Sequence, residues 1–152
     1  MAGHNAVRNR DRGIDLSDQP LSKFNTAVAL PTVRYIPMQE KSLEIERLDD
    51  AAGAGTIFRL HGPLLLGNFF SFQSLVRSDQ SKLLMVDVAD VPYIDSAGIG
   101  CLVGAHVSRE HSGRKLVVVG ATDRLLNMLK ATKVDQLFTF AGTVDEARTK
   151  VP

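Results

Sequence analysis

Apolar and polar residues follow two short strand-like patterns at the start of the segment that begins at Lys41. They alternate over 42–48, and a mainly apolar run with one arginine covers 56–61. Alternation with a period of two is typical of a half-buried strand. The intervening segment 49–55 contains two Asp and two Gly, which favours a turn. We therefore expect the two strands to pair antiparallel.

Two almost continuous apolar runs follow, Leu83–Val88 and Lys115–Val119. Such runs are typical of central strands that are covered on both faces. Helices are predicted around them, one beginning with Asn68 as its N-cap and one running from Ile99 to about His111. Their core-facing residues are expected to be Phe69, Phe72 and Val76 in the first, and Ile99, Leu102, Val103 and Val107 in the second.

The last part of the chain predicts two more helices and a short strand. Thr122 is the expected N-cap of one helix, and the spacing of Thr143 and Glu146 matches a capping box at the start of the other. A short strand is predicted over 137–140. This order predicts an α/β domain with a mostly parallel four- to five-stranded sheet, an N-terminal antiparallel strand and about four helices.

The expected division of the chain is a tail followed by one domain. Residues 1–38 contain Pro20, Pro31 and Pro37 and no regular apolar pattern, so we expect a flexible N-terminal tail. Residues 39–152 contain all the predicted strands and helices, and a chain of 152 residues is long enough for one sizeable core.

Composition narrows the class of protein. The formal net charge is +1, which gives no electrostatic reason to expect nucleic acid as a partner. The single cysteine, Cys101, excludes an internal disulfide and is expected to be a small buried hydrophobe, which fits a cytoplasmic protein. No apolar run approaches the ~18 residues of a membrane span, and the polar start lacks a signal peptide.

Motifs for catalysis or cofactor binding are not found. Glycines Gly98 and Gly100 lack the third glycine of a dinucleotide fingerprint, and no P-loop is present. His106 and His111 are five residues apart, not the four that place two ligands on one helix face. We expect no catalytic residue, no metal site and no cofactor.

The segment 91–100 places polar residues where a strand meets a helix. Ser96 is therefore expected at an exposed corner beside backbone N–H groups that favour negative charge. Because this corner and the loop Gly62–Asn68 both follow strands, we expect both at the edge where the parallel strands have their carboxyl ends. Ser96 could alternatively serve only as the N-cap of its helix.

The sequence of this corner, Asp95-Ser96-Ala97-Gly98-Ile99-Gly100, is similar to the Asp-Ser-Ser-Gly-Leu-Gly motif of the STAS domain family. Segments 59–64, 83–88 and 133–138 support the resemblance. In bacterial anti-sigma factor antagonists of this family, the motif serine is phosphorylated by the anti-sigma factor, which is a serine kinase. The unphosphorylated antagonist binds that kinase and frees the sigma factor, and phosphorylation breaks the complex.

The resemblance implies that Ser96 is the phosphate acceptor and that Asp95 orients it, while Asp95 could alternatively serve as a capping carboxylate. It also implies a partner-binding surface formed by Tyr93, Asp95, Ser96, Ala97, Gly98 and Ile99 together with Gly62 and Asn68 of the neighbouring loop. Ala97 stands where many members have a second serine, and Leu65 stands where many phosphorylatable members have an acidic residue.

The expected function is that of a cytoplasmic, non-catalytic anti-sigma factor antagonist, switched by phosphorylation, whose partner is a serine-kinase anti-sigma factor. A homodimer is left open. Two alternatives remain: a non-phosphorylated STAS subunit of a transport or stressosome complex, and a module that senses a small ligand or nucleotide.

Overall fold

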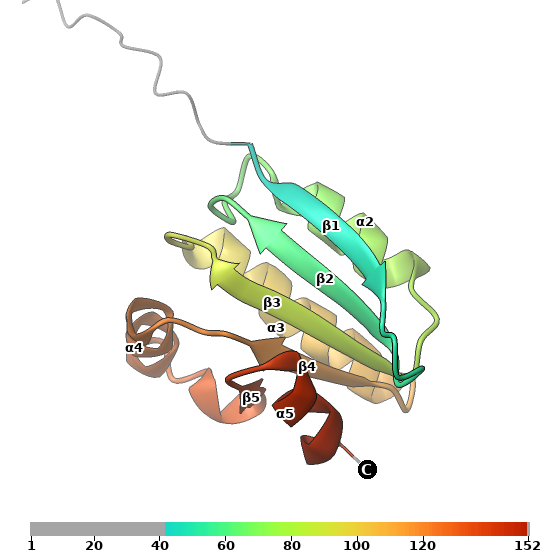
Figure 1. The fold of residues 1–152 in the computed structure, drawn as a ribbon. Helices are drawn as coiled ribbons and strands as arrows, with labels where there is room; N and C mark the ends of the chain where they lie inside the picture. The colour runs from blue at the N-terminus through green and yellow to red at the C-terminus, as the bar shows by residue number, and fades with distance from the viewer. Residues whose placement is uncertain (1–41, 152) are drawn as a thin grey trace, which may run out of the picture. The chain divides into compact units, whose positions relative to one another are not determined.

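The computed structural model of the chain describes residues 42–151, and the tail predicted for 1–38 lies outside them. One five-stranded sheet has the order β1-β2-β3-β4-β5 (Figure 1). Its strands are β1 (Glu44–Asp49), β2 (Thr56–His61), β3 (Leu83–Asp90), β4 (Lys115–Val119) and β5 (Thr139–Ala141). β1 pairs antiparallel with β2 and the other pairs are parallel, as the sequence predicts.

Four α-helices and one 3-10 turn occupy the described part of the chain. They are α2 (Phe69–Ser78), α3 (Ser96–His111), α4 (Asp123–Ala131), the turn η2 (Asp135–Leu137) and α5 (Val144–Lys150). Within residues 42–151, no helix is both long and apolar enough to cross a membrane. The fold class expected from the sequence is confirmed.

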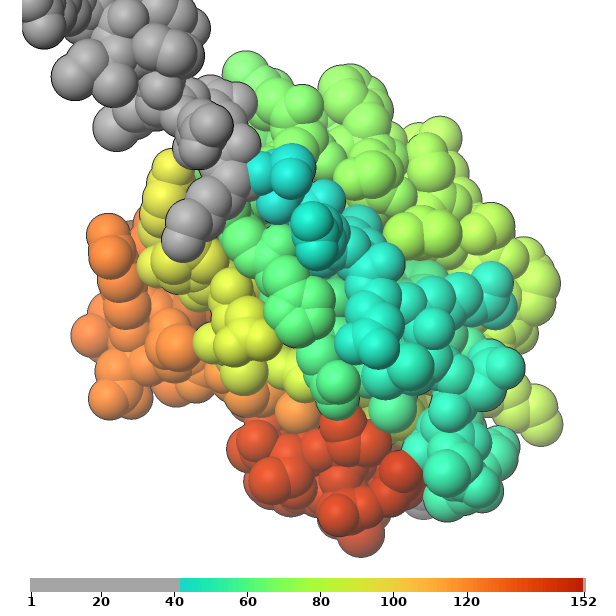
Figure 2. All heavy atoms as spheres, turned by 45° about the horizontal axis from the view of Figure 1, so that its top comes forward, coloured from blue at the N-terminus to red at the C-terminus, as the bar shows by residue number. Residues whose placement is uncertain are grey.

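Helices cover the two faces of the sheet unequally. The main core includes Phe58 of β2 and Leu84 of β3, which pack against Phe72 of α2 and Leu102 of α3. A smaller core on the other face joins strand residues such as Met85 to Ala147 of α5. Figure 2 shows the strands from β1 to β3, cyan to yellow, side by side and exposed next to α5 in red. β3 contributes to both cores, which explains why its sequence is apolar almost throughout.

The predicted N-caps at Thr122 and Thr143 are confirmed. The Thr122 hydroxyl accepts a hydrogen bond from the N–H of Leu125, and the Thr143 hydroxyl accepts one from the N–H of Glu146. The second cap differs from a strict capping box, because the Glu146 carboxylate accepts from the N–H of Gly142, at 2.7 Å.

Three sequence predictions need correction. Val107 is half exposed, and the apolar residues of α3 that face the core are Ile99, Cys101, Leu102 and Ala105, with Val103 partly buried. The predicted strand over 137–140 begins only at Thr139, because the 3-10 turn takes up Leu137. The helix α3 begins at Ser96 and not at Ile99, since its capping residue is earlier in the chain.

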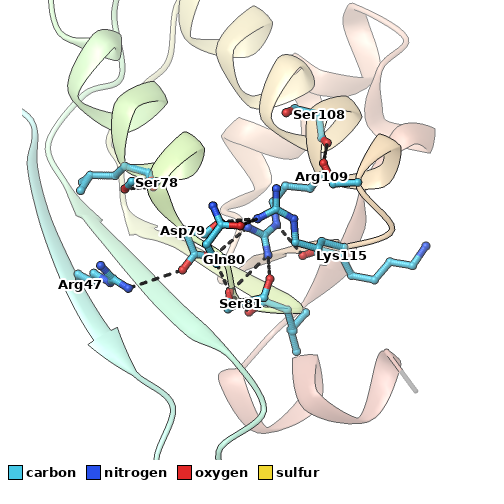
Figure 3. Close-up of polar contacts among 12 residues, drawn as sticks. Arg47, Ser78, Asp79, Gln80, Ser81, Ser108, Arg109 and Lys115 are labelled. Carbon is cyan, nitrogen blue, oxygen red and sulfur yellow. Dashed lines mark hydrogen bonds and ion pairs between the residues drawn. The ribbon is translucent and has the colours of Figure 1, made fainter.

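A buried ion pair joins α2, α3 and β4 at the end of the domain opposite Ser96 (Figure 3). Arg109 and Asp79 are both 1% exposed and lie 2.8 Å apart. Arg109 also donates to the backbone carbonyls of Lys115 and Ser81, at 3.0 and 2.6 Å. Because a buried charge is tolerated only with such partners, this network fixes how the three elements meet.

Candidate functional site

The carboxyl ends of β2 and β3 bring two loops into direct contact. Leu64 and Ile94 form an isolated parallel bridge between these loops. The N–H of Leu64 donates to the carbonyl of Tyr93, and the N–H of Asp95 donates to the carbonyl of Leu64, both at 3.3 Å. The loop Gly62–Asn68 and the Asp95-Ser96 corner therefore form one continuous surface, at the edge of the sheet expected from the sequence.

Asp95 is the residue that holds this corner together. It is the N-cap of α3, and its Oδ1 accepts a hydrogen bond from the N–H of Gly98 at 2.8 Å. Its Oδ2 accepts a second hydrogen bond from the N–H of Leu66 at 3.0 Å. One carboxylate thus satisfies a free N–H of the helix and anchors the neighbouring loop.

Gly98 allows the helix to approach that loop closely. A Cβ atom built on Gly98 would lie 2.3 Å from the carbonyl oxygen of Leu64 and 2.6 Å from Cγ1 of Ile94. Gly62 has a φ of 106°, and a Cβ there would lie 2.8 Å from the carbonyl oxygen of Ser42. Both positions therefore require glycine for the loops to keep their present path.

Asn68 occupies the predicted N-cap position of α2 but does not cap the helix with its side chain. Its Oδ1 accepts from the N–H of Leu65 at 2.8 Å, and its Nδ2 donates to the carbonyl of Pro63 at 2.9 Å. Asn68 therefore shapes the loop from within. Leu65 is partly buried in this loop.

Ser96 is the first residue of α3 and is exposed. Within residues 42–151 its hydroxyl makes no hydrogen bond, and the cap is supplied by Asp95. The alternative that Ser96 serves as the N-cap is therefore wrong. An exposed hydroxyl without an intramolecular partner is accessible to a second protein.

The other residues expected at a partner surface differ in exposure. Tyr93 is 45% exposed, and Ala97 and Gly62 are partly buried. Gly98 and Ile99 are buried, the latter in the main core. Gly98 can shape the surface only through its backbone, and the Ile99 side chain packs into the core and does not extend into solvent.

Two large apolar side chains at the same edge were not anticipated from the sequence. Leu66 is 65% exposed and Phe70 is 64% exposed. Leu66 belongs to the loop that Asp95 anchors, and Phe70 lies in the first turn of α2, stacked on Phe69 with ring centroids 4.3 Å apart. The sequence signal was the apolar residue Phe70 outside the predicted core stripe of Phe69, Phe72 and Val76, because a residue off that stripe faces away from the core. We call Leu66, Phe70 and Tyr93 the apolar rim.

Cys101 and His106, two titratable residues singled out in the sequence, both pack against other residues of the domain. Cys101 is buried, and desolvation raises the pKa of its thiol to about 11, so the reactive thiolate is disfavoured. The His106 ring packs edge-on against Phe138 with centroids 5.5 Å apart. In the described part of the chain, no group of three His, Cys, Asp or Glu residues is arranged to hold a metal ion.

Comparison with known proteins identifies the family. Residues 42–147 match the family model of the STAS domain. The chain belongs to the STAS domain family. An anti-sigma-B factor antagonist of Listeria monocytogenes serovar 1/2a is 34% identical over 64 residues, which cover 42% of this chain and 56% of that relative. The chain thus spans about half the length of the curated relatives it matches.

Solved structures share the fold at lower sequence identity. An anti-sigma factor antagonist from Mycobacterium paratuberculosis is 18% identical, with a TM-score of 0.63 over 72% of this chain and 94% of that one. A sulfate transporter family protein from Wolinella succinogenes is 21% identical, with a TM-score of 0.58 over 67% of this chain and 92% of that one. A protein named for regulation and a protein named for transport therefore share this fold.

Proposed function

We propose that this STAS domain is an anti-sigma factor antagonist whose Ser96 is phosphorylated by a serine-kinase anti-sigma factor in the cytoplasm. The observation that carries the proposal is the exposed Ser96 hydroxyl, without a hydrogen-bond partner in residues 42–151, at a corner that Asp95 holds rigid. The 34% identity to the Listeria anti-sigma-B factor antagonist supports the same function.

The geometry suits a kinase substrate. Asp95 uses both carboxylate oxygens to fix the first turn of α3 and the adjoining loop, so Ser96 is presented at a defined position. A kinase that docks here meets a hydroxyl whose phosphorylation breaks no hydrogen bond within residues 42–151. The role of the domain in this reaction is that of substrate and binding partner, and not of enzyme.

The apolar rim supplies the binding surface for the unphosphorylated state. Leu66, Phe70 and Tyr93 together expose large apolar side chains, which mark protein contacts when they gather at one edge. A Cβ atom added to Gly100, one turn after Ser96, would meet no atom within 4 Å, so a partner can approach the helix backbone closely there.

Phosphorylation would act on the interface more than on the fold. A phosphoserine carries close to two negative charges, which the free N–H groups at the start of α3 tolerate. The same group would have to lose its hydration to fit against a docked protein beside the apolar rim, which is costly. Phosphorylated protein should therefore keep its stability and lose its partner.

Binding of the anti-sigma factor to Ser96→Ala and Ser96→Asp tests the proposal, with Ser108→Asp as a matched control. Ser108 is an exposed serine on the same helix, about three turns from Ser96. Isothermal titration calorimetry should show wild-type affinity for Ser96→Ala and Ser108→Asp, and strongly reduced affinity for Ser96→Asp. Equal binding by Ser96→Asp and wild type would instead favour the fixed-subunit alternative, in which Ser96 is structural.

A further inference from the structure

A pocket lies at the end of the sheet opposite Ser96, where the parallel strands begin. Its volume is about 680 Å³, which is within the range of small-molecule sites. It is formed by the start of β3, the turn between α3 and β4, and the end of α5. In Figure 1 these segments meet where β3 and β4 start, close to the C-terminal end of α5.

The charged side chains that line the pocket are all cationic: Lys82, Arg114, Lys115 and Arg148. Two of them have carboxylate partners, because Lys115 pairs with Glu110 at 2.9 Å and Arg148 pairs with Asp50 and Asp145. Lys82 and Arg114 pair with no carboxylate within residues 42–151. Because Arg148 has two carboxylate partners, the four lining cations outnumber their three paired carboxylates by one, and Lys82 and Arg114 are the cations left to meet a ligand.

Hydrogen bonds to neutral groups and strand pairing hold these two residues in place. The Arg114 guanidinium donates to the backbone carbonyl of Asp79 and to Oε1 of Gln80, which orients it without cancelling its charge. Lys82 precedes β3, and its backbone carbonyl accepts from the N–H of Lys115 at 2.8 Å. The pairing of β3 with β4 thus places two lysines side by side.

The positive charge of Arg114 also acts on the buried Arg109. Burial lowers the pKa of Arg109, the nearby Asp79 raises it, and the positive charge of Arg114 lowers it again. Arg114 thus adds positive charge at this end of the domain, close to the buried Arg109. An anion bound in the pocket would be attracted by that charge.

We propose that this pocket binds a small phosphate-bearing anion through Lys82 and Arg114. The planar fork of arginine and the ammonium of lysine are the side chains that proteins use for phosphate oxygens. The lining contains no aromatic residue on which a base could stack, which favours a compact ligand such as a pyrophosphate or a phosphoester group. The site does not depend on the function proposed for Ser96.

The end of α3 does not oppose such a ligand strongly. The C-terminus of a helix carries partial negative charge on its free carbonyls. Here the carbonyl of Arg109 accepts from the N–H groups of Ser112 and Arg114, and that of Glu110 accepts from the N–H of Gly113. These hydrogen bonds satisfy the last carbonyls of α3 within the chain, and the charged side chains that line the pocket are cationic.

Titration of the full chain with sodium pyrophosphate, followed by ¹⁵N NMR at constant ionic strength, tests the proposal. Saturable shifts are expected for the amides of Ser112 and Gly113, with little change at Ser96. Lys82→Gln and Arg114→Gln should each raise the dissociation constant about tenfold, since each removes one charge-assisted contact. The affinity should also fall steeply with added salt.

Lys130→Gln is the matched control, because Lys130 is an exposed lysine on α4 that does not line the pocket. It should bind pyrophosphate as wild type does. Lys82→Gln changes only an exposed side chain, so this variant should fold as wild type does even if Arg114→Gln destabilises the domain. Linear shifts without saturation, or equal losses in Lys130→Gln, would overturn the proposal. So would binding to phosphatidylglycerol vesicles through Lys82 and Arg114 without any binding of free pyrophosphate.

Discussion

The Asp95 carboxylate accepts a hydrogen bond from the backbone N–H of Gly98 at 2.8 Å, and Gly98 itself lies against the carbonyl of Leu64. These two residues fasten the first turn of α3 to the loop that follows β2. The exposed hydroxyl of Ser96 lies between them in sequence, so its position depends on the same contacts.

Gly98→Ala should destabilise the domain. The added Cβ would lie 2.3 Å from the Leu64 carbonyl oxygen, which is backbone and cannot rotate away. Overpacking of this kind costs about 1–3 kcal/mol. Chemical denaturation should report that loss in the free energy of unfolding.

Gly100→Ala is the control for that substitution, because its Cβ would meet no atom within 4 Å. It lies in the same helix, where alanine is favoured over glycine by roughly 0.5–1 kcal/mol. The two substitutions should therefore change stability in opposite directions. A stable Gly98→Ala would show that helix and loop are not in close contact.

Leu102→Ala should cost about 2–5 kcal/mol, because Leu102 is fully buried in the main core. Val107→Ala on the same helix should cost less than about 0.5 kcal/mol, since Val107 is half exposed. Urea unfolding of both variants measures the difference. Similar costs for the two would mean that α3 presents a different face to the sheet.

Arg109→Met should destabilise the domain by about 3–5 kcal/mol, because it removes the buried partner of Asp79 and leaves only the half-exposed Arg47, whose Nη2 lies 3.8 Å from Asp79 Oδ1. Arg77→Met is the control, since Arg77 is an exposed arginine at the end of α2. Its unfolding free energy should stay near that of wild type. A mild effect of Arg109→Met would show that water reaches Asp79.

Stability should fall in acid. Burial alone would raise the pKa of Asp79, but hydrogen bonds from Ser81 and Arg109 and the positive charge of Arg109 help to lower it below its ordinary value of 3.8. The Arg148 guanidinium likewise lowers the pKa of Asp50. A carboxylate with a depressed folded-state pKa stabilises the fold above its unfolded pKa, and this contribution is lost as the pH falls through the folded value. Melting temperatures should thus decline below about pH 4, and a rise there would contradict these pKa directions.

Much of the fold follows from local patterns in the sequence. The apolar run of β3 and the helix caps at Thr122 and Thr143 depend on residues close to them in the sequence. Periodicity and residue type are therefore enough to predict them. Helical spacing alone predicts Val107 in the core, because it fits the apolar stripe of α3. Val107 is exposed because the buried face of α3 follows Cys101, Leu102, Ala105 and Arg109, and which face a helix turns to the sheet depends on tertiary packing that local spacing does not contain.

The contacts that build the site connect distant segments. Asp95 and Leu66 are 29 residues apart, and Asp79 and Arg109 are 30 apart, so no local pattern marks either pair. The corner at Ser96 could be located because parallel strands place their carboxyl ends at one edge. The pocket lined by Lys82 and Arg114 could not be located from the sequence, because strand pairing brings together segments that are distant in the chain.

Phosphorylation of the wild-type chain by its anti-sigma factor with ATP, followed by affinity measurement of the purified phosphoprotein, tests the central claim most directly. We predict one phosphate, mapped to Ser96 by peptide mass spectrometry, and an affinity for the anti-sigma factor at least ~100-fold lower, since burial of an unpaired charge costs several kcal/mol. The melting temperature should be unchanged. Phosphate on another residue, or a phosphoprotein that binds as tightly as the unmodified chain, would contradict the account.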